Sequence, residues 1–452
     1  MNDTGSLYKQ FAKYVSLNIL SMIGLSCYIF VDTFFISFKM GSDGLAALNI
    51  VLPVYGIING LGLMLGIGAA TLFTILQGRG RPGEADSVFS HALMIAAVLG
   101  LVITCCGFYF IGPIAKFLGA SGATAPLSEE YARVIFAFTL PFILNNILVA
   151  FVRNDHGPRL AMTAMLAGSL GNIILDYVFM FPLDMGMFGA ALATGFAPLI
   201  SMLILSVHFI RKNNSFRIAR TPVIIQRFAS ICSLGVPSFV LEFSSGIILF
   251  SFNQVLLRIS GNSAVAAYGI VANLAIIVVA IFTGIGQGVQ PLISRNFGIN
   301  NMRNVYRLYG AAVGLAFILG TVFYLIGFFF PGPISSIFNT RHDEQLGRMA
   351  ATGIRLYFLA FFVMGFNNVT ISFFSSISQP APSFIMSISK GIIITVPVLL
   401  LFSQLFGITG VWLTVPAAEF LTMLMGVIFL LTNKERRGTR LFRIRAERNA
   451  GT

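Results

Sequence analysis

The segment from Tyr14 to Phe38 is apolar along most of its length and contains no Lys or Arg. About 20 residues of helix span the hydrocarbon core of a bilayer, so this segment is long enough to cross a membrane. Similar segments recur along the chain, which is 56% hydrophobic and 10% charged and has a mean hydropathy of +0.87. Soluble domains carry about 25% charged residues. Because lipid cannot pair with backbone polar groups, we predict an all-α polytopic membrane protein.

Twelve candidate spans follow one another along the sequence. They begin near residues 14, 45, 88, 131, 160, 187, 230, 264, 306, 350, 383 and 408. With a cytoplasmic N-terminus, most of the 29 Lys and Arg residues fall on the inner side, as the positive-inside rule requires. We therefore expect a multi-pass protein of the plasma (inner) membrane with both termini in the cytoplasm. The basic tail is expected to lie against the anionic inner leaflet, and no nucleic-acid partner is expected from the net charge of +13.

The two halves of the chain resemble each other. The stretch that begins at Gly44 aligns without gaps with the one that begins at Ala264, and Asn145–Asn146 correspond to Asn367–Asn368, 222 residues later. Because each half has an even number of spans, both halves enter the membrane in the same orientation. We predict twelve transmembrane helices in two six-helix lobes, related by a pseudo-two-fold axis along the membrane normal. A duplication that serves stability alone is the alternative.

The longest inner loop divides the two halves and sets the expected domain boundaries. These are 1–212 for the N-terminal lobe, 213–229 for a cytoplasmic linker, 230–433 for the C-terminal lobe and 434–452 for the basic tail.

Two acids lie at matching positions in the first and fifth spans, where a charge costs at least a few kcal/mol. Asp32 and Asp176 each precede the end of an outward-running span by six residues, which places both about 9 Å below the outer boundary. Each has a polar residue four positions earlier, Tyr28 and Asn172, on the same helix face. Thr194 in the sixth span is expected at similar depth.

This group of oxygen atoms predicts a cation-coupling site. Two carboxylates in one pocket of low dielectric cannot easily both ionise, so the pair can load a proton outside and release it inside. Alternatively, Na+ binds at Asp32, Asn172, Asp176 and Thr194. A structural hydrogen-bonded pair that holds the helices together is the remaining interpretation.

Two further acids lie in the second half. Glu242, in the middle of the seventh span, is expected to line a substrate cavity with Asn145 and Asn253 and to attract a cationic substrate. A protonated Glu242 that is merely hydrogen-bonded is the alternative. Glu419 in the twelfth span is expected to be balanced by Lys390 in the eleventh, whose long side chain can reach it. A structural role for this pair is at least as well supported.

The P-loop signature of nucleotide-binding proteins is absent, because no Lys is followed by Ser or Thr. ATP is therefore excluded as the energy source for transport, and an ion gradient remains. The four histidines fall at helix ends or in loops without ligand spacing, so we expect no enzyme, no metal centre and no cofactor.

A channel is disfavoured by the repeat with buried acids. A flippase for a lipid-linked saccharide needs a cationic cavity, whereas the spans hold four acids and one Lys. An exporter of an endogenous metabolite remains an alternative.

The sequence resembles the MATE (multidrug and toxic compound extrusion) family across nearly its whole length, and within it the bacterial MepA-like branch. The resemblance rests on the order and spacing of "VDTFFIS…GLAALNIVLPV", "RNDHGPRLAMTAMLAGSLGNIILDYVF", "GMFGAALAT", "AAYGI" and "GQGVQPLISRNFG". It implies a secondary antiporter that exports lipophilic, often cationic drugs or toxic compounds in exchange for H+ or Na+. The two lobes would rock between inward- and outward-open states, and we expect a monomer.

The resemblance also bears on the site residues. It implies that Asp32 and Asp176 form the cation site of the N-terminal lobe, with Tyr28, Asn172 and Thr194 at matching positions. Some members have a second cation site in the other lobe, with an Asp in the tenth helix. Here that span reads "FLAFFVMGFNNVTISFF" and has no acid, which puts coupling through the C-terminal lobe in doubt.

Overall fold

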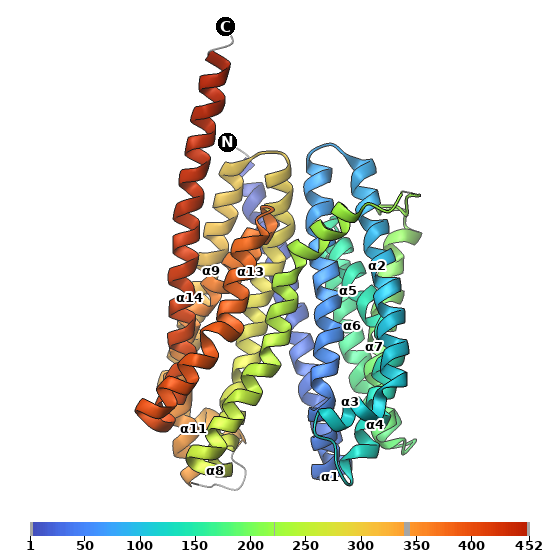
Figure 1. Ribbon diagram of the computed structural model, residues 1–452, viewed down its shortest axis with the longest axis vertical. Helices are drawn as coiled ribbons and strands as arrows, with labels where there is room; N and C mark the ends of the chain where they lie inside the picture. The colour runs from blue at the N-terminus through green and yellow to red at the C-terminus, as the bar shows by residue number, and fades with distance from the viewer. Residues whose placement is uncertain (1–2, 221, 339–343, 450–452) are drawn as a thin grey trace.

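The computed structural model describes residues 3–220, 222–338 and 344–449. Every regular element in these residues is a helix (Figure 1). Within this part of the chain, nine helices are long and apolar enough to cross a membrane, or ten when the bent pair α4 (Thr124–Ala137) and α5 (Thr139–Asn154) counts as one span. Two of these nine stretches fold back on themselves and provide two spans each. The predicted all-α fold with twelve spans is confirmed.

Glycines make the sharpest reversals of the chain. The helix α1 (Asp3–Gly78) turns back at Gly41 (φ 66°), α8 (Ile225–Gly298) at Gly261 (φ 67°) and α14 (Thr395–Asn449) at Gly407 (φ 56°). Glycine adopts positive φ at little cost because it lacks a Cβ. Gly41 and Gly261 are 220 residues apart, which is the offset between Gly44 and Ala264 in the sequence repeat. The two halves therefore turn their first pair of spans at equivalent residues.

The other helices complete the two halves. In the first half they are α2 (Pro82–Tyr109), α3 (Ile111–Phe117), α4, α5, α6 (Pro158–Met180) and α7 (Gly186–Ile210). In the second half they are α9 (Met302–Phe329), α10 (Pro331–Phe338), α11 (Glu344–Tyr357), the 3-10 turn η1 (Phe358–Ala360), α12 (Phe361–Ser376), α13 (Pro380–Ile388) and the π-helical turn η2 (Ser389–Ile393).

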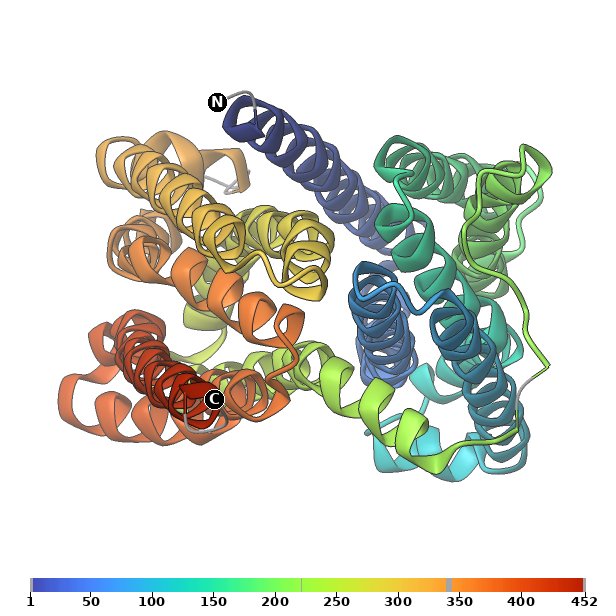
Figure 2. The same cartoon turned by 90° about the horizontal axis from the view of Figure 1, so that it is seen from above.

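The helices form two bundles that stand side by side (Figure 1 and Figure 2). One contains α2–α7 with the second half of α1, and the other contains α8–α14. Both chain ends lie at the same end of the molecule (Figure 1), as an even number of spans requires. We call this the terminal end, and the other the turn end because Gly41, Gly261 and Gly407 reverse the chain there.

The first half of α1 passes from one bundle to the other. Leu7, Phe11 and Tyr14 are buried in the hydrophobic core of the C-terminal bundle. Further along the same helix, Ile36 is buried in a core that belongs to the N-terminal bundle. The first turns of α1 therefore pack with the second half of the chain.

Polar side chains join the two bundles at the terminal end. Asn18 of α1 donates to the carbonyl oxygen of Gly284 in α8 (3.0 Å). Arg153, at the end of α5, donates to Asn18 Oδ1 and to Gln287 Oε1 of α8 (3.0 Å each). All three side chains extend from the terminal halves of their helices, so the bundles are closed against each other at this end.

The segment that connects α7 to α8 is held against the N-terminal bundle by its own backbone. Its N–H groups donate to side chains at distances of 2.7 to 3.0 Å. The donors are Ser215, Arg217, Ala219 and Ile224, and their acceptors are Asp155, Asp86, Ser90 and His91. The linker is expected to run from residue 213 to residue 229, but α8 already begins at Ile225. The apolar residues that follow Ile225 pack on α1 and extend the helix into this interval.

Two glycines allow the helices to approach closely at the terminal end. A Cβ at Gly68 of α1 would overlap the carbonyl oxygen of Ile231, and a Cβ at Gly235 of α8 would overlap that of Met64. Backbone atoms cannot move aside as a flexible side chain can. These positions therefore fix the spacing of α1 and α8.

Gly235→Ala is expected to lower the melting temperature of the purified protein, because overpacking of a close contact costs about 1–3 kcal/mol. Gly269→Ala is the matched control on the same helix, since no atom among the described residues lies within 4 Å of a Cβ there. Fluorescence-detected gel filtration after heating measures both. Equal melting temperatures for the two variants would contradict the close packing of α1 on α8.

Candidate functional site

Asp32 and Asp176 meet inside the N-terminal bundle, toward the turn end. Asp32 lies on α1, nine residues before the reversal at Gly41, and Asp176 lies in the last turns of α6. The first is 7% exposed and the second is fully buried. Their carboxyl groups are within hydrogen-bonding reach of each other. Such a pair can hold one shared proton or one small cation.

Asn172 and Thr194 complete one side of this acid pair. Asn172 lies one turn before Asp176 on α6 and is fully buried. In the amide orientation that matches its neighbours, its nitrogen donates to Asp176 Oδ2 (3.1 Å) and its oxygen accepts from the backbone N–H of Thr194 on α7 (3.2 Å). The opposite orientation would place the amide oxygen against the carboxylate. The amide thus links the carboxylate of α6 to the backbone of α7.

Tyrosines surround the other side of the pair. The Tyr28 hydroxyl, one turn before Asp32, is 3.3 Å from the Tyr55 hydroxyl on the second half of α1. Tyr131 of α4 is 4% exposed and lies beside Thr194 of α7. The structure thus brings together all five residues predicted for cation coupling and adds Tyr55 and Tyr131 to them.

The acid pair keeps free acceptor capacity. Among the described residues, Oδ1 of Asp32 and Oδ1 of Asp176 are buried and have no hydrogen-bond partner. No Lys, Arg or His in the described ranges forms an ion pair with either acid. In the same residues no group of three or more His, Cys, Asp and Glu side chains could hold a metal ion. The oxygen atoms present fit a proton or a monovalent cation.

Glu242 lies at the interface between the bundles. Its Oε1 accepts from Asn59 Nδ2 on α1 (3.1 Å), and Asn59 Oδ1 accepts from Asn146 on α5 (3.1 Å). Asn145, which precedes Asn146, has a buried Oδ1 without a partner in the described part of the chain. Asn253 lies eleven residues beyond Glu242 on α8, about 16 Å further along the helix. Glu242 is therefore linked through Asn59 to Asn146, the residue that follows Asn145. Asn253 lies away from this group.

Glu419 and Lys390 form the predicted pair in the C-terminal bundle. Lys390 Nζ is 2.9 Å from Glu419 Oε1, and only 3% of the glutamate side chain is exposed. The prediction that the two charges balance each other is confirmed.

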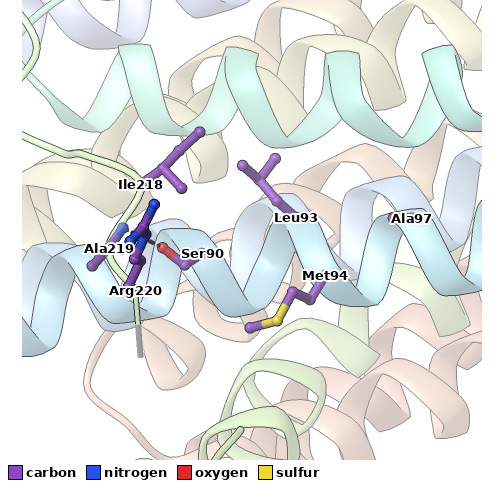
Figure 3. Close-up of a pocket in the computed structure, with 7 residues that line it drawn as sticks. All are labelled: Ser90, Leu93, Met94, Ala97, Ile218, Ala219 and Arg220. Atoms are coloured by element: carbon purple, nitrogen blue, oxygen red, sulfur yellow. Dashed lines mark hydrogen bonds between the residues drawn. The ribbon is translucent and has the colours of Figure 1, made fainter. Parts of the chain in front are cut away.

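A surface pocket of about 640 Å³ lies between α2 and the segment that leads to α8. Figure 3 shows Leu93 and Met94 of α2 on one side and Arg220 on the other, with Ser90 accepting from the N–H of Ala219 (2.8 Å). None of the four acids predicted to function lines it. It is separate from the acid pair.

Sequence reasoning did not include Tyr55, Asn59 and Tyr131 in the site. Tyr55 and Asn59 are four residues apart in an otherwise apolar run, and this spacing places them on one helix face. That pattern could have indicated them. No local pattern indicates Tyr131, because its place beside Thr194 depends on how α4 packs against α7.

Two repeat-related lobes of six spans each are an architecture found in transporters. Comparison with known proteins identifies the family. The MatE family profile matches residues 18–178 and 236–401, and the chain therefore belongs to the MatE family.

One relative agrees with this assignment, and two solved structures share the fold. The multidrug export protein MepA of Staphylococcus aureus (strain MRSA252) is 30% identical over 415 residues, which cover 90% of each chain. An outward-facing structure of a multidrug resistance MATE family transporter superposes with a TM-score of 0.86 at 24% identity, covering 93% of this chain and 95% of that one. A mutant of the Vibrio cholerae MATE transporter VcmN gives a TM-score of 0.88 at 18% identity, with 96% and 99% covered.

Asn172→Leu is expected to destabilise the N-terminal bundle, because it leaves the buried Asp176 Oδ2 without its amide partner. An unsatisfied buried polar group costs about 1–3 kcal/mol, which a lower melting temperature would report. Leu170→Ala on the same helix is the control, since Leu170 is 59% exposed. An Asn172→Leu protein as stable as the Leu170→Ala protein would show that the amide does not hold the two helices together.

Proposed function

We propose that the protein is a secondary antiporter that exports lipophilic organic cations, including drugs and toxic compounds, in exchange for H+ or Na+. The observation that carries the proposal is the buried pair of Asp32 and Asp176, which retains acceptor oxygens without a counter-ion in the described residues. The relatives named as multidrug export proteins support the class of substrate. We assign the chain no catalytic residue and no cofactor.

The proposed topology places the terminal end in the cytoplasm of the cell and the turn end outside. The distribution of Lys and Arg in the loops supports this orientation. The basic tail then lies at the anionic inner leaflet, and one chain is sufficient for transport. In this topology the contacts of Arg153 with Asn18 and Gln287 would close the cytoplasmic side, as in an outward-facing state.

In the proposed cycle a cation from outside reaches the acid pair in this state. Proton binding neutralises the two carboxylates, whereas Na+ would bind to their oxygen atoms together with those of Asn172 and Thr194. Either event changes the packing of α1, which carries Asp32 and Tyr28 and also contacts the opposite bundle through Tyr14. The substrate leaves outward, the lobes rock, and the cation is released inside.

Glu242 is proposed to contribute a negative charge to the substrate cavity between the lobes. Its carboxylate lies at the lobe interface beside Asn59, so a bound organic cation would replace an amide partner with a full positive charge. Asn145 supplies a further acceptor whose oxygen has no partner among the described residues, and Asn253 would contribute further along α8.

Asp32→Asn is expected to abolish gradient-driven efflux of ethidium from proteoliposomes, because the amide cannot exchange a proton or neutralise Na+. Asp184→Asn is the control: this acid is exposed, pairs with Lys39 (2.7 Å) and lies in the loop between α6 and α7. A pH gradient and a Na+ gradient are imposed separately, and the gradient that drives wild-type efflux names the coupling ion.

Two outcomes would count against the proposal. Unchanged efflux in the Asp32→Asn protein would make the acid structural. No efflux by folded, oriented wild-type protein under either gradient would favour a lipid-linked saccharide or an endogenous metabolite as the substrate.

A further inference from the structure

The C-terminal bundle contains a buried cluster that the transport cycle described above does not use. Glu419 of α14, Asn367 and Asn368 of α12 and Lys390 of η2 contact one another within the bundle. Asn367 is fully buried, and Asn368 and Glu419 are 7% and 3% exposed. Three helices thus contribute a carboxylate, two amides and one ammonium group to a single place.

Two oxygen atoms contact the ammonium group of Lys390. Its Nζ is 2.9 Å from Glu419 Oε1 and donates to Asn368 Oδ1 at 2.7 Å. Asn367 Nδ2 donates to the other carboxylate oxygen of Glu419 (2.7 Å) and to its backbone oxygen (2.8 Å). Asn367 Oδ1 is buried and, among the described residues, has no hydrogen-bond partner. Carboxylate and amide oxygens are ligands that hard cations accept, and here an ammonium group lies between one of each kind.

The backbone around Lys390 departs from the α-helix. The π-helical turn Ser389–Ile393 carries the lysine, and the N–H of Ile394 donates to the oxygen of Ser389 (2.9 Å). Within this turn a Cβ at Gly391 would overlap the side chain of Ser244 on α8. Single π-turns inside helices occur frequently at functional sites. Here the turn sits against α8 and directs the lysine toward α12 and α14.

The internal repeat shows that this cluster is a feature of one lobe. Asn367–Asn368 correspond to Asn145–Asn146 at the offset of 222, but Lys390 corresponds to Gly168. A Cβ at Gly168 would lie 3.0 Å from the carbonyl oxygen of Ala197 on α7, so the equivalent helices of the N-terminal bundle meet through small residues. Duplication alone therefore does not account for the charged pair.

The acid pair of the N-terminal bundle has apolar counterparts in the other lobe. Asp32 corresponds to Phe252 at the offset of 220, and Asp176 corresponds to Val398 at the offset of 222. The two lobes therefore neutralise their buried acids in different ways. One keeps carboxylates without a protein counter-ion in the described residues, and the other supplies an ammonium group on a lysine side chain.

We propose that Glu419 and Asn368, with Asn367 holding the carboxylate in place, form a monovalent-cation site that the ammonium group of Lys390 occupies permanently. This lobe then takes up no free coupling cation, and the exchange ion binds only at Asp32 and Asp176. What this site means for ion coupling rests on the antiporter proposal. The site itself is defined by the contacts of Lys390 alone. The lysine side chain is 15% exposed, so a small cation can reach its place once the lysine is removed.

The test uses full-length protein in detergent, in an Asp32→Asn background that disables the N-terminal site. Lys390→Ala is introduced, and melting temperatures are compared in sodium chloride, methylammonium chloride and choline chloride at equal ionic strength. We expect Lys390→Ala to melt lower than its parent in choline and to regain several degrees, saturably, in methylammonium or sodium. The parent with Lys390 in place should show no such difference between the salts.

Lys390→Ala/Glu419→Gln is the matched control, because it has no charge left to bind a cation. The same stabilisation by methylammonium or sodium in this double variant, or none in Lys390→Ala, would overturn the proposal and leave a structural ion pair. If Lys390→Ala aggregates in choline, recovery of monodisperse protein in methylammonium supports the proposal and aggregation in all three salts contradicts it. No transport is measured, so failure of the antiporter proposal would leave this result intact.

Discussion

The cost of placing a carboxylate inside a bilayer governs this structure. A charge at membrane depth costs at least a few kcal/mol unless a partner neutralises it, and the chain carries such acids in both lobes. In the C-terminal lobe Lys390 neutralises Glu419 at 2.9 Å. In the N-terminal lobe Asp32 and Asp176 lie within reach of each other, and no cation of the described residues pairs with them. We propose that a proton or cation from outside the protein neutralises them. This difference is the basis of the proposed coupling.

The path of α1 connects this ion site to the relation between the lobes. Its first turns, including Phe11 and Tyr14, are buried in the C-terminal core, whereas Ile36 is buried in the N-terminal core. Asp32 lies between these two regions on the same helix. A change of charge at Asp32 therefore acts on a helix that both lobes hold, and the same helix carries Asn18, which helps to join the bundles at the terminal end.

Much of the fold could be predicted from the sequence, because length and apolarity define a span and the internal repeat relates the two halves. The Asp32–Asp176 cluster was also accessible, since helical rise converts a position in a span into a depth. The contact of Glu242 with Asn59 could not be predicted, because the two residues meet only through packing between the lobes. The burial of the first turns of α1 in the C-terminal lobe could not be predicted either. The sequence shows that a helix face is apolar but does not indicate which bundle will cover it.

The most direct test of the central claim is the release of a coupling ion when substrate binds. Ethidium would be added to wild-type and Asp32→Asn/Asp176→Asn protein in weakly buffered detergent solution, while a pH electrode and a sodium electrode record the ions released. The account predicts that the wild type releases H+ or Na+ in proportion to ethidium bound and that the double variant binds ethidium without release. Equal release from both proteins would contradict the assignment of coupling to the acid pair.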